Sequence, residues 1–149
     1  MTAKEFLWKS YCERAIANDL RQKFVEAVKD WDCAIELSPK EEQPNFRASR
    51  AISRLNAGMV AEAVAEVAEL TKLPNWNVGQ WYDFAYVYAA ASGKIADKKA
   101  EYAERAMELL RKSVKAGYKD VAHLKQDKDL DPLRERDDFK KLLAELQKK

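Results

Sequence analysis

The side chains that could perform acid–base, nucleophilic or metal chemistry are few in this sequence. There is one histidine, His123, and there are two cysteines, Cys12 and Cys33. The cysteines do not form a C-x-x-C pair, and a single histidine cannot complete a zinc site with them. His123 has no serine or cysteine beside it, so we expect a structural histidine. We therefore expect no metal and no cofactor.

Cys12 is the more interesting of the two thiols. Its acidic neighbours Glu13 and Asp19 would raise the pKa of the thiol and keep it protonated, which disfavours a nucleophile. The chain has 25 acidic residues, and their spacing singles out no carboxylate pair. We expect a protein that is not an enzyme.

Composition narrows the fold class. The 149 residues include only four glycines, 47% are hydrophobic and 35% are charged, which favours one all-α globular unit. A formal charge of +2 gives no basic arm, so no nucleic-acid partner is expected. No apolar run is long enough for a membrane span, and the charged start does not resemble a signal peptide. We expect a cytoplasmic protein with no membrane partner.

Small and large residues recur at fixed offsets in the first 40 residues. They are Tyr11, Ala15, Ala27, Trp31, Ala34 and Pro39. These residue types in this order resemble a tetratricopeptide repeat (TPR), in which two antiparallel helices approach closely at the alanines and a proline ends the second helix. Asn18 departs from the pattern, where the TPR family usually has an aromatic residue.

Two further repeats follow at related spacings. Ala51, Gly58 and Ala63 form a degenerate second repeat, and the segment from Trp81 to Tyr88 begins a clearer third. From Trp81 onward the chain also resembles the TPR tails of some bacterial Ser/Thr protein kinases, although it lacks kinase motifs. The expected boundaries are repeat 1 at about 8–41, repeat 2 at about 44–74, repeat 3 at about 78–118 with an insertion near 92–102, and a capping segment at 119–149.

The resemblance implies a right-handed α-solenoid of three TPR helix-turn-helix repeats with C-terminal capping helices, forming a single domain. We expect helices near 3–20, 24–37, 44–57, 60–72, 77–92, 97–116, 120–126 and 136–147. Trp81, Phe84 and Tyr88 should lie in the core, and Gly117 should end a helix.

By analogy with the TPR family, a concave groove would bind a protein or peptide partner. The groove positions are Lys9, Cys12, Ile16, Asp19, Asn45, Ala48, Ile52, Leu55, Tyr82 and Tyr86. Tyr82 and Tyr86 lie on one helix face, where they could line a groove or serve only as packing. We expect a non-catalytic adaptor or scaffold.

Two alternatives stay open. An apolar groove could be occupied by the chain's own C-terminal helix or by a second copy, making a homodimer or larger self-assembly. Arg47, Arg50 and Arg54 share a helix stripe and could bind an anion. The sequence favours instead that these arginines pair with the row Glu62, Glu66 and Glu69.

Overall fold

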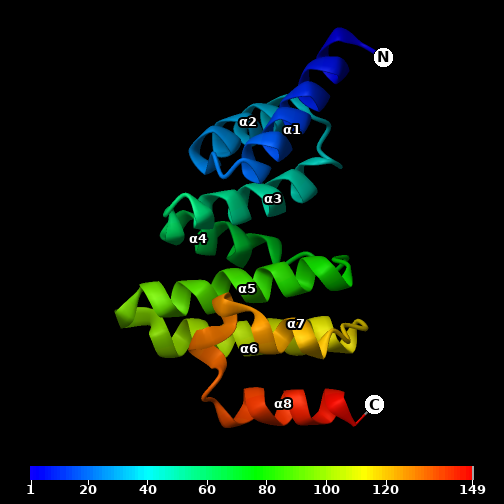
Figure 1. Ribbon diagram of the computed structural model, residues 1–149. Helices are drawn as coiled ribbons and strands as arrows, with labels where there is room; N and C mark the ends of the chain where they lie inside the picture. Colours follow the sequence, from blue (N-terminus) through cyan, green and yellow to red (C-terminus); the bar gives the residue numbers. More distant parts are fainter. Residues whose placement is uncertain (149) are drawn as a thin grey trace. The chain divides into compact units, whose positions relative to one another are not determined.

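The structure is a computed structural model that describes residues 1–148, and all regular elements in that range are helices (Figure 1). The α-helices are α1 (Ala3–Leu20), α2 (Phe24–Leu37), α3 (Gln43–Asn56), α4 (Val60–Leu70), α5 (Val78–Lys94), α6 (Lys99–Lys115), α7 (Val121–Gln126) and α8 (Asp137–Gln147). Two short 3-10 helices are η1 (Ala96–Lys98) and η2 (Lys128–Leu133). The all-α prediction is confirmed, and the predicted helix ends lie close to the observed ones.

The chain divides into two compact units, which are described separately. The first runs from Met1 to Leu73 and holds α1 to α4, and the second begins at Pro74 and holds α5 to α8. Within residues 1–148, no helix is both long enough and apolar enough to cross a bilayer.

In the first unit each helix packs against the next one along the chain. Ala15 of α1 and Ala27 of α2 are completely buried, which allows the two helix backbones to approach closely. Trp31 fills the space beside them and stacks on Phe46 of α3 with ring centroids 5.9 Å apart. The expected helix end before Pro39 is confirmed, because α2 stops at Leu37.

The second unit is built on the antiparallel pair α5 and α6, with η2 packed on α5 (Figure 1). Trp81, Phe84 and Tyr88 are buried as predicted. The start of α5 has a reciprocal capping box, in which Asn77 and Gln80 satisfy each other's backbone N–H groups. The predicted insertion contains the end of α5, η1 and the start of α6.

The C-terminal segment is anchored to the second unit by leucines and arginines. Leu124, Leu130 and Leu133 are completely buried. The Arg134 guanidinium donates to the carbonyls of Leu124 and Asp127, which ties α7 to η2. The short helices are therefore part of the unit's core rather than a loose tail.

Three residues that follow helices have left-handed backbone conformations. Gly58 and Gly117 have φ of 86° and 119°, so the prediction that Gly117 ends a helix is confirmed. The third is Gln22, with φ of 60°, in the turn between α1 and α2. This turn is closed by the Lys23 N–H, which donates to the Asn18 carbonyl at 2.8 Å. A side chain at a left-handed position is unfavourable by about 1 kcal/mol.

We expect Gln22→Gly to raise the free energy of unfolding by about 0.5–1 kcal/mol, because glycine adopts this conformation without the Cβ clash. The Gln22 side chain is exposed, so little contact is lost. Urea denaturation measures the change. Gln22→Ala is the matched control and should leave stability nearly unchanged, since alanine keeps the Cβ; equal stabilisation by both variants would contradict the backbone explanation.

Candidate functional site

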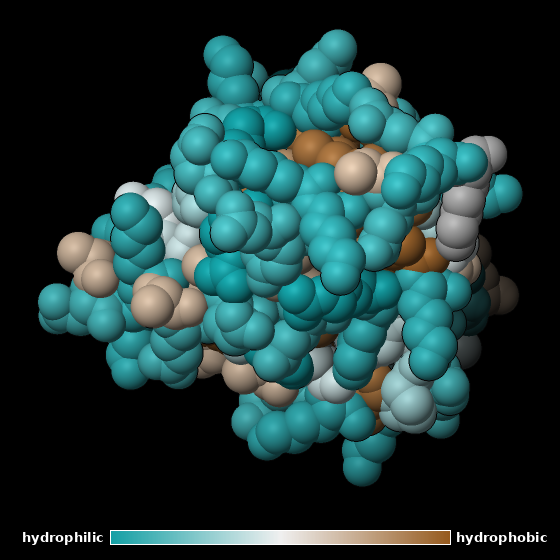
Figure 2. Space-filling view, turned by 90° about the horizontal axis from the view of Figure 1, so that it is seen from below, coloured by the Kyte–Doolittle hydropathy of each residue, from teal (hydrophilic) through white to brown (hydrophobic). Residues whose placement is uncertain are grey.

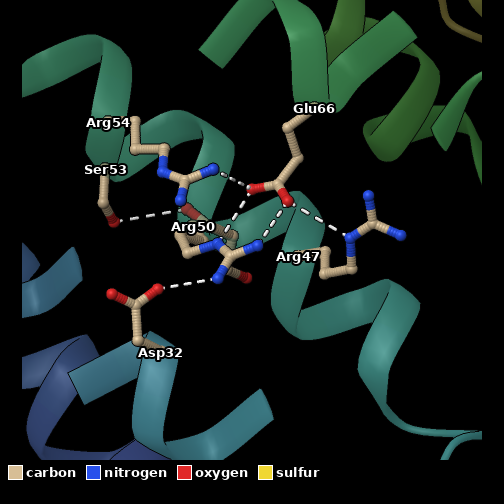
Figure 3. Close-up of polar contacts among 7 residues, drawn as sticks. Asp32, Arg47, Arg50, Ser53, Arg54 and Glu66 are labelled. Atoms are coloured by element: carbon tan, nitrogen blue, oxygen red, sulfur yellow. Dashed lines mark hydrogen bonds and ion pairs between the residues drawn. The ribbon is translucent and has the colours of Figure 1, made fainter. Parts of the chain in front are cut away.

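Three arginines of α3 converge on one carboxylate of α4 in the first unit (Figure 3). Arg50 donates from Nε and Nη2 to the two oxygens of Glu66 at 3.0 and 2.6 Å. Arg47 Nε and Arg54 Nη1 donate to the same carboxylate at 3.2 and 3.1 Å. Arg50 Nη1 also bonds Asp32 Oδ1 of α2 at 2.7 Å. The cluster therefore links three helices.

The electrostatics of this cluster favour charged side chains throughout. Only 3% of the Glu66 side chain is exposed. Burial alone would raise the pKa of Glu66, but the hydrogen bonds and charges of the arginines, chiefly Arg50, outweigh it and lower the pKa below the usual value. Hydrogen bonding to Glu66 and to Asp32 raises the pKa of Arg50, against the opposing effect of burial. The predicted anion site is thus already supplied with carboxylates: Glu66 of the expected glutamate row and Asp32 of α2.

Asp19, one of the predicted groove residues, is also engaged inside the first unit. Its carboxylate accepts a hydrogen bond from Trp31 Nε1 at 3.1 Å and another from Ser53 Oγ at 2.7 Å. Asp30 of α2 similarly accepts from Arg14 and Asn18 of α1. Both carboxylates join helices together, so neither faces outward to receive a partner.

The remaining predicted groove residues of the first unit differ in accessibility. Cys12, Ala48 and Leu55 are buried, Lys9 and Ile52 are half-buried, and Asn45 and Ile16 are exposed. Burial, together with Glu42 and Glu13, raises the pKa of the Cys12 thiol to about 11, which keeps it protonated at neutral pH. Of the apolar members, Ile16 is the most available to a partner, with half of its surface exposed.

A shallow pocket of about 540 Å³ lies between the start of α1 and the end of α2. Its lining includes Trp8, Lys9, Leu37, Pro39 and Glu42. The Lys9 ammonium is paired with Glu5 at 2.8 Å and lies 5.4 Å from the centre of the Trp8 ring. The pocket combines an aromatic wall with balanced charges and belongs wholly to the first unit.

Tyr82, the central residue of the predicted groove, is covered by the C-terminal part of the second unit. Only 8% of it is exposed. Its ring stacks on Tyr118 at 4.7 Å between centroids, and its hydroxyl donates to Asp127 Oδ2 at 2.5 Å. Burial and the bond to Asp127 raise the pKa of Tyr82. Tyr86, on the same helix, is half-buried, and burial raises its pKa to about 12.

His123 lies beside this pair. Its Nε2 is 3.5 Å from Asp127 Oδ2, and its ring centre is 5.4 Å from that of Tyr82. Asp83, also on α5, has a pKa raised to about 6 by burial, although part of its surface remains exposed. His123 therefore contacts a carboxylate and an aromatic ring of its own unit.

Sequence reasoning missed Asp127 and Tyr118, which bury Tyr82. Asp127 is 45 residues from Tyr82 along the chain, so no helical spacing pairs them. The one local signal is the i,i+4 spacing of His123 and Asp127 on α7 and its C-cap. Within residues 1–148, no group of three or more histidine, cysteine or acidic side chains could hold a metal ion.

Glu66→Gln should lower the free energy of unfolding by roughly 2–4 kcal/mol, because it leaves three arginines without their shared negative charge. Partial exposure of those arginines keeps the loss below that of a fully buried pair. The matched control is Glu69→Gln on the same helix, where the exposed pair with Lys72 is worth little. Urea denaturation of both variants measures the difference.

The same carboxylate predicts the direction of the pH dependence. The folded-state pKa of Glu66 is lowered, so its stabilisation is present above the usual value of 4.5 and is lost as pH falls through the folded-state pKa. The stability difference between the wild type and Glu66→Gln should therefore shrink in acid. A difference that stays constant from neutral pH to about pH 3 would contradict the ion-pair explanation.

Tyr82→Phe should destabilise the protein by roughly 1.5–3 kcal/mol, since it removes a hydrogen bond to a carboxylate that is mostly buried. A double-mutant cycle with Asp127→Asn isolates this pair from the other contacts of each residue. We expect a coupling free energy of about 1 kcal/mol or more, measured by urea denaturation. Strictly additive effects would show that the two groups do not interact.

Comparison with known proteins assigns the chain to a family. The model of the A/B hydrolase-like, N-terminal domain matches residues 48–149, which include Arg50, Arg54 and Glu66 of the arginine cluster and the whole Tyr82 group. No TPR family is detected. No curated protein and no solved structure matches the chain significantly.

The resemblance to TPR proteins, and to the TPR tails of kinases, is therefore wrong, and the expectation of three TPR repeats falls with it. The residues that carried it, such as Ala15, Ala27, Trp31 and Pro39, meet requirements shared by any closely packed helical hairpin. These residues indicate close helix packing, and they do not identify a protein family. Because the family model covers more than half of its length, the chain belongs to the A/B hydrolase-like N-terminal domain family.

Proposed function

We propose that this chain is a non-catalytic helical interaction domain whose partner is an A/B hydrolase-like domain. The family description names an N-terminal domain of hydrolase-like proteins, which supports a helical unit that accompanies a separate catalytic part. The polar clusters of the described residues also support a non-catalytic role for this helical unit. Their carboxylates bond arginine, tyrosine, tryptophan and serine side chains of their own unit.

The observation that carries the proposal is the apolar outer face of α1, defined by Phe6 and Ile16. These side chains are 65% and 50% exposed. At about 100° per residue, Ala15 lies on the side of the helix opposite Phe6, so the buried and exposed apolar residues occupy different faces. A helix that is apolar on its outer side as well as its inner side is suited to a second packing partner.

The surface of α8 exposes fewer apolar side chains than the outer face of α1 does. Figure 2 shows the molecule from below, and that face is mostly hydrophilic with apolar residues in small separate patches. The exposed residues of α8 include Lys140, Lys141 and Glu145, whereas its apolar Phe139 and Leu142 are buried. The outer face of α1 is therefore a better candidate for protein contact than the surface of α8.

Self-association through α1 is a second candidate, because an exposed apolar face can also bind its own copy. The two candidates differ in whether the oligomeric state of the isolated chain depends on protein concentration. Sedimentation velocity at several concentrations detects a dimer, whereas a hydrolase-like partner leaves the isolated chain monomeric. A dimer that dissociates in Phe6→Ser/Ile16→Ser would replace the first proposal with the second.

The decisive test is affinity capture from a lysate of the producing organism with the wild type and with Phe6→Ser/Ile16→Ser. We expect an A/B hydrolase-like protein to be retained by the wild type and reduced at least tenfold with the variant, because exposed apolar anchors dominate such interfaces. Leu73→Ser is the matched control, since Leu73 is an exposed leucine outside α1. Equal retention by wild type and variant would remove α1 from the mechanism.

A further inference from the structure

A pocket of about 460 Å³ lies between the end of α6 and the end of α8 in the second unit. Its lining residues are Val114, Gly117, Tyr118, Lys119 and Leu146. This volume falls within the range of about 300–1,000 Å³ that is usual for small-molecule sites. The outer face of α1 belongs to the first unit, so binding at this pocket is additional to the proposed function.

The apolar stripe of α8 loses its packing at this pocket. Leu146 lies seven residues after Phe139 and four after Leu142, which places the three side chains on one side of the helix. Phe139 and Leu142 are buried, whereas Leu146 is only half-buried. The end of the stripe therefore borders the pocket instead of the core.

The apolar stripe of α6 ends in the same way. Val114 lies seven residues after Met107 and four after Leu110, and both of these earlier side chains are completely buried. Val114 itself is half-buried. An apolar ligand between Val114 and Leu146 would continue the core and remove their remaining surface from water, which is favourable.

The backbone fixes the third wall, which is Tyr118. The Tyr118 N–H donates to the Ser113 carbonyl and the Gly117 N–H to the Val114 carbonyl, both at 3.0 Å. Together with the left-handed Gly117, these bonds form a Schellman motif at the end of α6. The Tyr118 ring stacks on Tyr82 with centroids 4.7 Å apart. The aromatic wall is thus held in place before a ligand arrives, which lowers the entropic cost of binding.

Lys119 is the one charged residue in the lining of this pocket, as residues 1–148 define it. Its side chain is exposed, and no ion pair with it is recorded in that part of the chain. The adjacent acid, Asp120, lies outside the lining and accepts the His123 N–H at 3.0 Å. Its charge weakens the attraction of Lys119 for an anion, so a modest preference for a negative group is expected.

We propose that this pocket binds a small apolar molecule that carries one carboxylate. Its body packs between Val114, Tyr118 and Leu146, and its carboxylate lies beside the Lys119 ammonium. Burial of the body supplies most of the affinity, because an exposed ion pair contributes little. The ion pair instead selects a carboxylate over a neutral or a cationic group. The pocket is too small for a stable protein interface, which buries about 1,200 Å² or more.

Methyl NMR titration of the whole chain tests the proposal with octanoate, octanamide and octylammonium, which share one apolar tail. We expect octanoate to shift the Val114 and Leu146 signals saturably and to leave those of Leu73, exposed in the first unit, unchanged. Octanoate should bind about threefold more tightly than octanamide, as one exposed ion pair allows, and octylammonium should bind most weakly. Absence of saturable shifts at about 5 mM octanoate overturns the proposal. So does octanamide or octylammonium that binds as tightly as octanoate.

A charge variant tests the role of Lys119. Lys119→Gln should abolish the preference for octanoate over octanamide and leave octanamide binding unchanged, because the neutral probe forms no ion pair. The matched control is Lys115→Gln, which removes an exposed lysine outside the lining and should keep the preference. An equal loss in both variants overturns the proposal, since net charge alone would then explain the selectivity.

A filling variant tests the position of the apolar body. Val114→Phe places a ring in the pocket, so octanoate and octanamide should both bind at least tenfold more weakly. Val25→Phe makes the same change at an exposed valine of the first unit and should bind both probes as the wild type does. Wild-type affinity in Val114→Phe overturns the proposal. Circular dichroism shows whether each variant folds, and the comparison of Lys119→Gln with Lys115→Gln stays decisive if Val114→Phe does not.

Discussion

The close approach of antiparallel helices is the constraint on which both compact units depend. Ala15 and Ala27 in the first unit and Ala85 and Ala106 in the second are completely buried, and larger side chains at these positions would push the helix pairs apart. Aromatic residues must then lie beside the alanines, where Trp31 and Phe84 are found. Polar side chains that fall at such seams are excluded from water and need partners on the facing helix.

Buried carboxylates meet that need in a consistent way. Glu66 receives hydrogen bonds from α3, Asp30 from α1, and Asp127 from α5. Each bond links helices that the apolar contacts already bring together, so it selects one arrangement of the pair. The carboxylates of these clusters thus contribute to the packing of the helices. The proposed interaction is accordingly placed on the exposed surface.

The helices and the core were predictable because they follow from local patterns. Apolar spacing indicated the helices, Pro39 and Gly117 marked the ends of two of them, and the alanines marked the close contacts. The pairing of Arg50 with Glu66 was also foreseeable, since charged rows on consecutive helices face each other. The burial of Tyr82 was not, because Asp127 comes from a distant segment whose position depends on Leu124 and Leu130. The family was misjudged because close helix packing selects the same residue types in unrelated proteins.

The exposed apolar residues are distributed unevenly with respect to the family match. Within residues 48–148, Leu73 is the sole large hydrophobic side chain among those recorded as exposed, whereas Phe6, Leu7, Ile16, Leu20 and Val25 all precede the matched segment. The matched part therefore buries most of the surface of its large apolar side chains when it folds. The hairpin of α1 and α2 uses one side for packing on Phe46 and the core, and keeps apolar groups on its outer side. Such groups contribute little to the core of the first unit, and they leave apolar surface available for contact with another surface.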